Sequence, residues 1–394
     1  MIRHFIIIIA SFLFVLSHLI AQNPQQQPLP AGLKPLPSNI NQNGYPAVTD
    51  DYRVAFRFRA PQAEKVQIDL GRRYDMVKDS EGFWSVTTDP QDPGFHYYSL
   101  ILEGIAVADP ASESFYGMGR MASGIDIPEK GVTFHELRNV PRGTIRSEWY
   151  FSNVTNSWRP MNVYTPPGYD TEPNRKYPVL YLWHGGGEDE RGWAIQGRTA
   201  IILDNLIAEG KAVPMIIVIG NGNAGSARGA TGYNDDAMEV FKEELVENII
   251  PFVEKRFRAY TDKNNRAISG LSMGGGQSYF TGLRNLHLFA AIGVFSSGLF
   301  GRTQDANYDP ESEIPGILTN PQKWNDALDI FYISCGEGDP RIEPTRRVVQ
   351  RFRSAGVKVE FSAFPGGHEW HPWRKSLHEF VQMIFNLHYS YSLQ

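Results

Sequence analysis

The chain has 394 residues, of which 42% are hydrophobic and 21% are charged, and its formal net charge is -5. This composition is typical of a globular protein, and the length exceeds what one hydrophobic core usually organises, so we expect two domains. Because no run of Lys or Arg stands out, we expect no nucleic-acid partner. Cys335 is the one cysteine, which excludes an intramolecular disulfide.

The N-terminus has the features of a cleavable secretory signal. Arg3 precedes an apolar run from Phe5 to Leu16, and Ala21 stands at the expected cleavage point. The run is short for a membrane span, although an uncleaved anchor helix is the alternative. We therefore expect residues 1–21 to be removed, no membrane span afterwards, and a secreted or periplasmic protein.

The next part of the chain predicts a small all-β domain. Residues 22–44 are rich in Pro, Gln and Asn without periodicity, which favours an irregular tether. Beyond them, short segments with period-two alternation, such as residues 53–59, are separated by turn clusters, with no helical stretch between them. We predict an immunoglobulin-like sandwich over residues 45–115 and a linker over residues 116–145, which lack clear periodicity.

Beyond residue 146 the pattern changes to apolar β runs alternating with amphipathic helices. Helical spacing is expected over residues 235–257, 342–355 and 371–388. The runs between them, such as PVLYLWHGG and MIIVIGNG, are nearly continuous in apolar residues. Such runs indicate a mostly parallel sheet covered by helices on both faces, so we predict an α/β domain over residues 146–394.

In such sheets the chemistry gathers where the strands end, and the segment Gly270-Leu271-Ser272-Met273-Gly274 follows the run RAISG. A serine nucleophile in a strained strand-to-helix turn needs small residues on both sides. The five-residue pattern is weak by itself, but this context favours Ser272 as a nucleophile. The backbone amide of Met273 is then expected to help stabilise an oxyanion.

Three further post-strand segments fit the same reaction. His184 and three glycines follow VLYLW, where free backbone amides suit an oxyanion and the histidine braces the loop. Asp339 follows IFYIS and His368 follows VEFSAF, giving the chain order Ser, Asp, His of α/β-hydrolases. We prefer these two residues to Glu337 and His371, which we expect at the rim or surface.

Other chemistries find little support. The closely spaced histidines near the C-terminus lack an HExxH frame, and no Walker loop or dinucleotide fingerprint follows a strand, so we expect neither a metal nor another cofactor. Trp193, Trp370 and Trp373 flank the predicted site and are candidates for a substrate pocket that takes a flat acyl group. For each tryptophan, core packing is the alternative.

The segment from Gly143 onward resembles carbohydrate esterase family 1, the feruloyl and acetylxylan esterases. The resemblance rests on WRPMNVYTPPGYD, YPVLYLWHGGGEDERGW, ISGLSMGGGQS, ISCGEGD and FPGGHEWHPWRKSLHEF. It implies an α/β-hydrolase fold and cofactor-free ester hydrolysis on plant cell-wall polysaccharide or feruloylated oligosaccharides. It also implies Ser272, Asp339 and His368 as the triad and Gly186 with Met273 as oxyanion donors.

The segment GFHYYSLILEGIAVADP resembles the immunoglobulin-like module of carbohydrate-binding family 48. Whether this module contacts sugar or serves as a spacer or lid support stays open at this point. For the whole chain, hydrolysis of ferulate or related hydroxycinnamate esters on arabinoxylan is the preferred hypothesis. The alternatives are an acetylxylan esterase, a siderophore-ester hydrolase, and a non-catalytic carbohydrate-binding protein.

Overall fold

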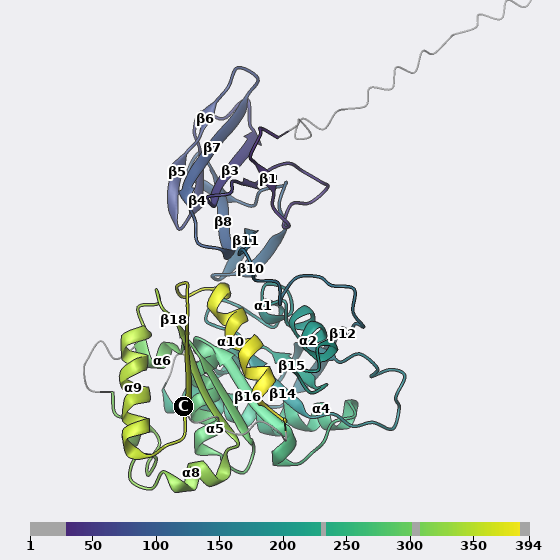
Figure 1. Cartoon of the computed structure of the whole chain (residues 1–394), viewed down its shortest axis with the longest axis vertical. Coiled ribbons are helices and arrows are strands. Elements are labelled where there is room, and N and C mark those ends of the chain that lie inside the picture. Colours follow the sequence, from purple (N-terminus) through teal and green to yellow (C-terminus); the bar gives the residue numbers. More distant parts are fainter. Residues whose placement is uncertain (1–28, 230–233, 302–307, 387–394) are drawn as a thin grey trace, which may run out of the picture.

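A computed structural model describes residues 29–229, 234–301 and 308–386, so the predicted signal over residues 1–21 lies outside the described residues. A strand-only N-terminal domain sits on a larger α/β domain (Figure 1). In the described ranges, no helix has the length and apolar character needed to cross a membrane.

The N-terminal domain contains two sheets in which all strand pairs are antiparallel. The first has the order β1-β2-β3-β7-β6, and the second has the order β10-β11-β8-β4-β5 with β9 beside β8. Apolar side chains at alternate positions, such as Phe56 and Ile68, pack in one core. The predicted all-β sandwich is therefore confirmed.

The strands of this domain have the following bounds: β1 Lys34–Pro35, β2 Ala47–Val48, β3 Arg53–Arg59, β4 Val66–Leu70, β5 Arg72–Asp75, β6 Val77–Lys78, β7 Phe83–Pro90, β8 Gly94–Leu102, β9 Ile105–Val107, β10 Ser114–Gly117 and β11 Arg120–Ile127.

The structure corrects two of the expected boundaries. β1 lies within residues 22–44, and β11 lies within the expected linker 116–145, where it pairs with β8. The linker prediction failed because β11 is buried on both faces and so shows no alternation. Ile125 belongs to the sandwich core, whereas the carboxylate of Asp126 meets Arg374 of the α/β domain.

The α/β domain is built on an eight-stranded sheet with the order β12-β13-β15-β14-β16-β17-β18-β19. The pairs β12·β13 and β13·β15 are antiparallel, and every pair from β15 to β19 is parallel. The strand bounds are β12 Thr144–Ser152, β13 Ser157–Thr165, β14 Val179–Trp183, β15 Ile216–Gly220, β16 Arg266–Leu271, β17 Ala291–Phe295, β18 Ile330–Gly336 and β19 Glu360–Phe364.

Helices cover both faces of this sheet, as predicted (Figure 1). α3, α4, α5 and α9 contribute to the hydrophobic cluster on one face, and α1, α2 and α10 contribute to the cluster on the other. Their bounds are α1 Arg191–Ala194, α2 Thr199–Ala208, α3 Asp235–Glu243, α4 Ile250–Arg256, α5 Met273–Arg284, α6 Gly298–Gly301, α7 Pro310–Glu313, α8 Gln322–Ala327, α9 Ile342–Ala355 and α10 Trp370–Met383, with 3-10 turns η1 Asn223–Arg228 and η3 Lys263–Asn265.

The helix predicted over residues 235–257 is not uniform. A π-helical segment, η2 Glu244–Ile249, separates α3 from α4. Pro251 explains the break, because proline has no N–H to donate and its ring clashes with the carbonyl four residues earlier in a regular α-helix. The predictions for α9 and α10 are closer, although α10 ends at Met383 rather than residue 388.

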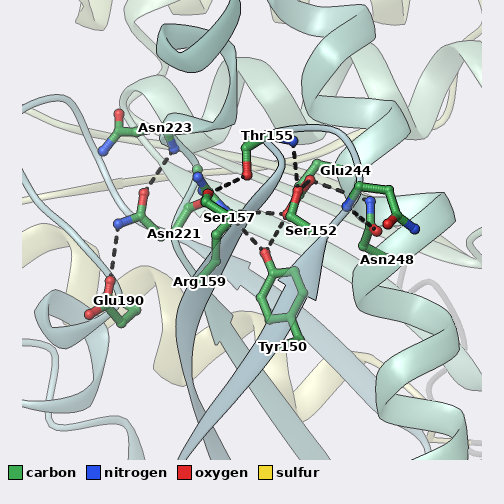
Figure 2. Close-up of polar contacts among 12 residues, drawn as sticks. Tyr150, Ser152, Thr155, Ser157, Arg159, Glu190, Asn221, Asn223, Glu244 and Asn248 are labelled. Carbon is green, nitrogen blue, oxygen red and sulfur yellow. Dashed lines mark hydrogen bonds and ion pairs between the residues drawn. The ribbon is translucent and has the colours of Figure 1, made fainter.

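A buried polar network connects the β12–β13 hairpin to the π-helical segment η2, which begins at Glu244 (Figure 2). The Glu244 carboxylate accepts hydrogen bonds of 2.6 Å from Tyr150 and from Ser152 and lies 3.3 Å from the Nε atom of Arg159. Arg159 also donates to the carbonyl of Asn221, directly after β15. One carboxylate thus fixes the sheet edge and a loop at the carboxyl end of the strands.

Replacing Glu244 with Ala should lower the free energy of unfolding by about 3–5 kcal/mol, because it leaves the half-buried Arg159 without its ionic partner and the buried hydroxyls of Tyr150 and Ser152 without their acceptor. Glu247, one turn away and exposed, is the matched control, and its replacement by Ala should change stability by less than ~0.5 kcal/mol. Urea titration followed by circular dichroism measures both. Equal stability of the two variants would contradict the assigned role of the network.

Candidate active site

Three parallel strands deliver the predicted residues to one edge of the sheet. Ser272 follows β16, Asp339 follows β18, and His368 follows β19. The Nδ1 atom of His368 lies 2.7 Å from Asp339 Oδ2, and its Nε2 atom lies 3.0 Å from Ser272 Oγ. Residues that are far apart in the chain therefore form one continuous hydrogen-bonded series.

Ser272 occupies a strained turn between β16 and α5. Its φ of 49° and ψ of -110° are unfavourable for a residue with a side chain. A Cβ atom at Gly270 would lie 2.5 Å from the backbone of Gly274, and one at Gly274 would lie 2.6 Å from the His184 carbonyl oxygen. Glycine is therefore required on both sides, which is the physical basis of the sequence pattern.

Asp339 is held as an oriented carboxylate. Oδ2 faces His368, while Oδ1 accepts from the backbone N–H of Arg341 at 2.9 Å and from its guanidinium at 3.1 Å. Burial raises the pKa of Asp339, but the hydrogen bond and charge of His368, followed by the backbone N–H and charge of Arg341, outweigh it, so the pKa lies below its ordinary value. Arg341 was not identified from the sequence. Its position two residues after the predicted acid, Asp339, is the signal that could have suggested it.

Glu337 and His371, the alternatives to Asp339 and His368, differ in their exposure. Glu337 is exposed, as expected for a rim residue. His371 is only 5% exposed, so the expectation of a rim or surface position was wrong for it. Its Nε2 atom lies 3.3 Å from Glu129, in the contact between the two domains. His371 is on the surface of the α/β domain alone, but the N-terminal domain covers it.

The glycine loop, residues 184–187, lies beside Ser272. Both ring nitrogens of His184 bind backbone groups, Nδ1 near the carbonyl of Gly185 at 2.8 Å and Nε2 near the amide of Gly222 at 3.0 Å. This confirms the bracing role predicted for His184. Within the described residues, the amides of Gly186 and Met273 have no hydrogen-bond acceptor, as oxyanion donors require.

A cavity of about 780 Å³ opens over Ser272 and His368. Trp370 and Trp373 line it, and the Trp373 ring lies edge-on to His368 with centroids 5.0 Å apart. Trp193 does not line it, contrary to expectation, because its ring is fully buried and its Nε1 donates to the carbonyl of Trp183. Core packing, the alternative for Trp193, is what the structure shows.

About half of the residues that line the cavity come from the N-terminal domain, for which the sequence left sugar contact, a spacer and a lid support open. Its contribution includes Asp69, Phe95, His96, Tyr97 and Arg120. The alternation of apolar and polar residues predicts the strands of this domain. It does not indicate which edge of the domain faces the site. Among the described residues, no cluster of three or more His, Cys, Asp or Glu side chains is arranged to hold a metal ion.

The chain belongs to the family described as "Putative esterase", whose sequence pattern matches residues 152–384. It is 36% identical over 363 residues to the endo-1,4-beta-xylanase/feruloyl esterase of Xylanibacter ruminicola, covering 89% of this chain and 47% of that protein. The chain thus spans about half the length of this curated relative. The resemblance to feruloyl esterases is confirmed.

Solved structures agree on the fold. A CE1 ferulic acid esterase from Anaeromyces mucronatus, solved in complex with ferulic acid, is 26% identical with a TM-score of 0.54, covering 66% of this chain and 96% of that chain. An enterochelin esterase from Shigella flexneri is 16% identical with a TM-score of 0.62, covering 84% and 91%. The second likeness shows the fold alone, and together they confirm the predicted α/β-hydrolase fold.

Replacing Gly274 with Ala should lower the free energy of unfolding by about 1–3 kcal/mol, because the new Cβ meets backbone atoms that cannot move away. Gly186 is the matched control in the adjoining loop, since a Cβ there meets no atom within 4 Å. Its replacement by Ala should cost less than ~0.5 kcal/mol. Thermal and urea unfolding compare the two, and a Gly274→Ala variant as stable as the control would refute the steric account of the turn.

Proposed function

We propose that this chain is a serine esterase in which Ser272 is the nucleophile, His368 the general base and Asp339 the orienting acid. The single observation that carries the proposal is the series Asp339, His368 and Ser272 at 2.7 and 3.0 Å. The carboxylate can only accept, so the His368 Nδ1–H donates to it and Nε2 is left free to take the serine proton.

The reaction proceeds in two halves. The hydroxyl of Ser272 attacks the ester carbonyl as its proton passes to His368, and the oxyanion of the tetrahedral intermediate binds the free amides of Gly186 and Met273. The alcohol leaves with the proton from His368. Water then attacks the acyl-enzyme by the same route, which releases the acid and restores the serine.

We propose hydroxycinnamate esters on arabinoxylan as the substrate class, with ferulate as the first candidate. The printed function of the Xylanibacter ruminicola relative and the ferulic acid bound to the Anaeromyces mucronatus enzyme support this choice. The aromatic side chains that line the cavity, Phe95, Tyr97, Trp370 and Trp373, also suit a flat phenolic group.

The charge of the cavity supports a neutral sugar ester over a catecholate siderophore. Asp69, Asp92 and Glu369 line it, and Arg120 is the one permanently cationic side chain among its described lining residues. A multiply negative catecholate ligand would meet like charges there, whereas hydroxyl groups of a pentose can donate hydrogen bonds to carboxylates.

We also propose that the chain acts outside the cytoplasm. The basic residue and apolar run ahead of Ala21 support this placement. An insoluble wall polymer is moreover accessible only to an exported enzyme.

Incubation with feruloylated arabinoxylan should release ferulate, detected by chromatography, and Ser272→Ala should reduce the rate at least 10³-fold because no acyl-enzyme can form. Release of acetate alone would instead assign an acetylxylan esterase, and turnover of a catechol trilactone without ferulate release would assign a siderophore esterase. Retention of the polymer by the wild type and Ser272→Ala alike, with no product from either, would assign a non-catalytic binding protein.

Replacing Arg341 with Met should lower kcat/KM about tenfold, because Asp339 Oδ1 loses the guanidinium hydrogen bond that helps to orient its carboxylate toward His368. Arg341→Lys keeps a cationic donor at this position and should lose less. Steady-state kinetics compares the two variants, and a kcat/KM of the Met variant within about twofold of the wild type would exclude an orienting role for Arg341.

A further inference from the structure

The two domains share one hydrophobic core at the active-site end of the molecule. Phe95 and Phe115 of the N-terminal domain belong to the same buried cluster as Trp193, Trp370 and Trp373 of the α/β domain. Side chains of β8 pack on both faces of its sheet, because Tyr98 lies in the sandwich core while Phe95 faces the α/β domain. The N-terminal sandwich is therefore packed against the catalytic machinery and is not a separate module on a linker.

Buried ion pairs reinforce this contact next to the loop that carries His368. Arg374 of α10 is fully buried, and its guanidinium donates to both carboxylate oxygens of Asp126 in β11 at 3.0 and 3.1 Å. Arg198 lies 2.8 Å from the same carboxylate. The first residues of α10, directly after His368, are thus fixed from the N-terminal side.

The β10–β11 turn touches the glycine loop directly. The backbone N–H of Gly119 donates to the carbonyl of Gly187 at 2.8 Å. Gly187 has a φ of 76°, and a Cβ there would lie 3.0 to 3.3 Å from the backbone of Met118 and Gly119. A side chain at residue 187 would crowd this contact and strain the backbone at its positive φ, so the close approach favours glycine.

The hydroxyl of Tyr97, on β8, is the polar centre of this contact. It accepts hydrogen bonds from Gln196 Nε2 at 2.9 Å and from Trp370 Nε1 at 3.2 Å. A hydroxyl has two lone pairs and one proton, so its O–H is left to donate to Glu188 Oε1 at 3.2 Å. Every hydrogen-bonding capacity of the group is used.

Glu188 transmits this contact to the glycine loop. Its other oxygen, Oε2, accepts from the backbone N–H of Gly185 at 3.3 Å, which fixes the peptide plane that precedes the free amide of Gly186. Glu188 is 6% exposed, and burial raises its pKa to about 7 against the opposing hydrogen bonds from Gly185 and Tyr97. Burial also raises the pKa of Tyr97, which therefore stays a neutral donor.

We propose that the N-terminal sandwich is a built-in part of the catalytic site and that Tyr97 is a positioning residue that holds the glycine loop and the His368-bearing loop in register. This inference rests on the proposed esterase function. It assigns the sandwich a role on every ester substrate, including small ones that reach no further than the cavity. A domain that only retained polysaccharide would have no such effect.

The test compares Tyr97→Phe with Tyr98→Phe in the full chain, using methyl ferulate as a small soluble substrate. Tyr98 is the matched control because it is the next residue of β8 and its buried hydroxyl bonds to Asp109 inside the sandwich, away from the site. Tyr97→Phe should lower kcat about tenfold while KM changes less than about twofold, because the oxyanion donors lose alignment. Tyr98→Phe should keep kcat within about twofold even where its melting temperature falls.

A combined Tyr97→Phe and Glu188→Ala variant should lose no more kcat than the worse single variant, because both changes break the same series of contacts. An unchanged kcat for Tyr97→Phe, an equal loss in Tyr98→Phe, or a rise in KM alone would each overturn the positioning role. In those cases the wild-type chain still hydrolyses the ester, and the proposed function stands. A wild-type chain without esterase activity would remove both proposals.

Discussion

The strained backbone at Ser272 is the constraint on which the rest of the site depends. A side chain at φ 49° is tolerated only because β16 and α5 hold the turn from both ends and because glycines let the backbones of residues 183, 184 and 274 close around it. The glycine loop approaches the turn just as closely, because a Cβ added at Gly185 would lie 3.3 Å from Ser272 Cβ, so the turn and the loop cannot be positioned independently. The turn that exposes the Ser272 hydroxyl therefore also places the two amides proposed as oxyanion donors.

The second determinant is the packing of the strand-only domain over the edge of the sheet. β8 and β11 are buried on two faces, one in the sandwich core and one against the α/β domain, and together with neighbouring turns they supply one wall of the cavity. The carboxyl groups that this wall and the opposite one contribute make the cavity suited to neutral, hydroxyl-rich ligands. Under the proposed function, the residues that bind the ester and the contacts that support the glycine loop belong to the same interface between the domains.

Much of the fold and the grouping of the candidate site residues could be predicted from the sequence, because both depend on local signals repeated along the chain. Apolar runs identify the strands, and the residue types directly after them identify Ser272, Asp339 and His368 without knowledge of the packing. What failed depends on contacts between distant segments. β11 looked irregular because both of its faces are buried, His371 looked exposed because the domain over it was unknown, and Trp193 looked like a pocket residue although it packs beneath the site. Tyr97 and Glu188 are separated by 91 residues, and no pattern in either segment predicts the hydrogen bond between them.

The central expectation is that Ser272 is activated by His368 at the carboxyl edge of the sheet. The most direct measurement is the rate of phosphonylation by a fluorophosphonate, with the modified peptide identified by mass spectrometry, in the wild type and in a His368→Ala variant. We expect a single adduct on Ser272 in the wild type and a labelling rate at least about 100-fold lower in the variant, because general-base assistance contributes that much. Modification at another serine, or labelling of Ser272 at the same rate without the imidazole, would contradict it.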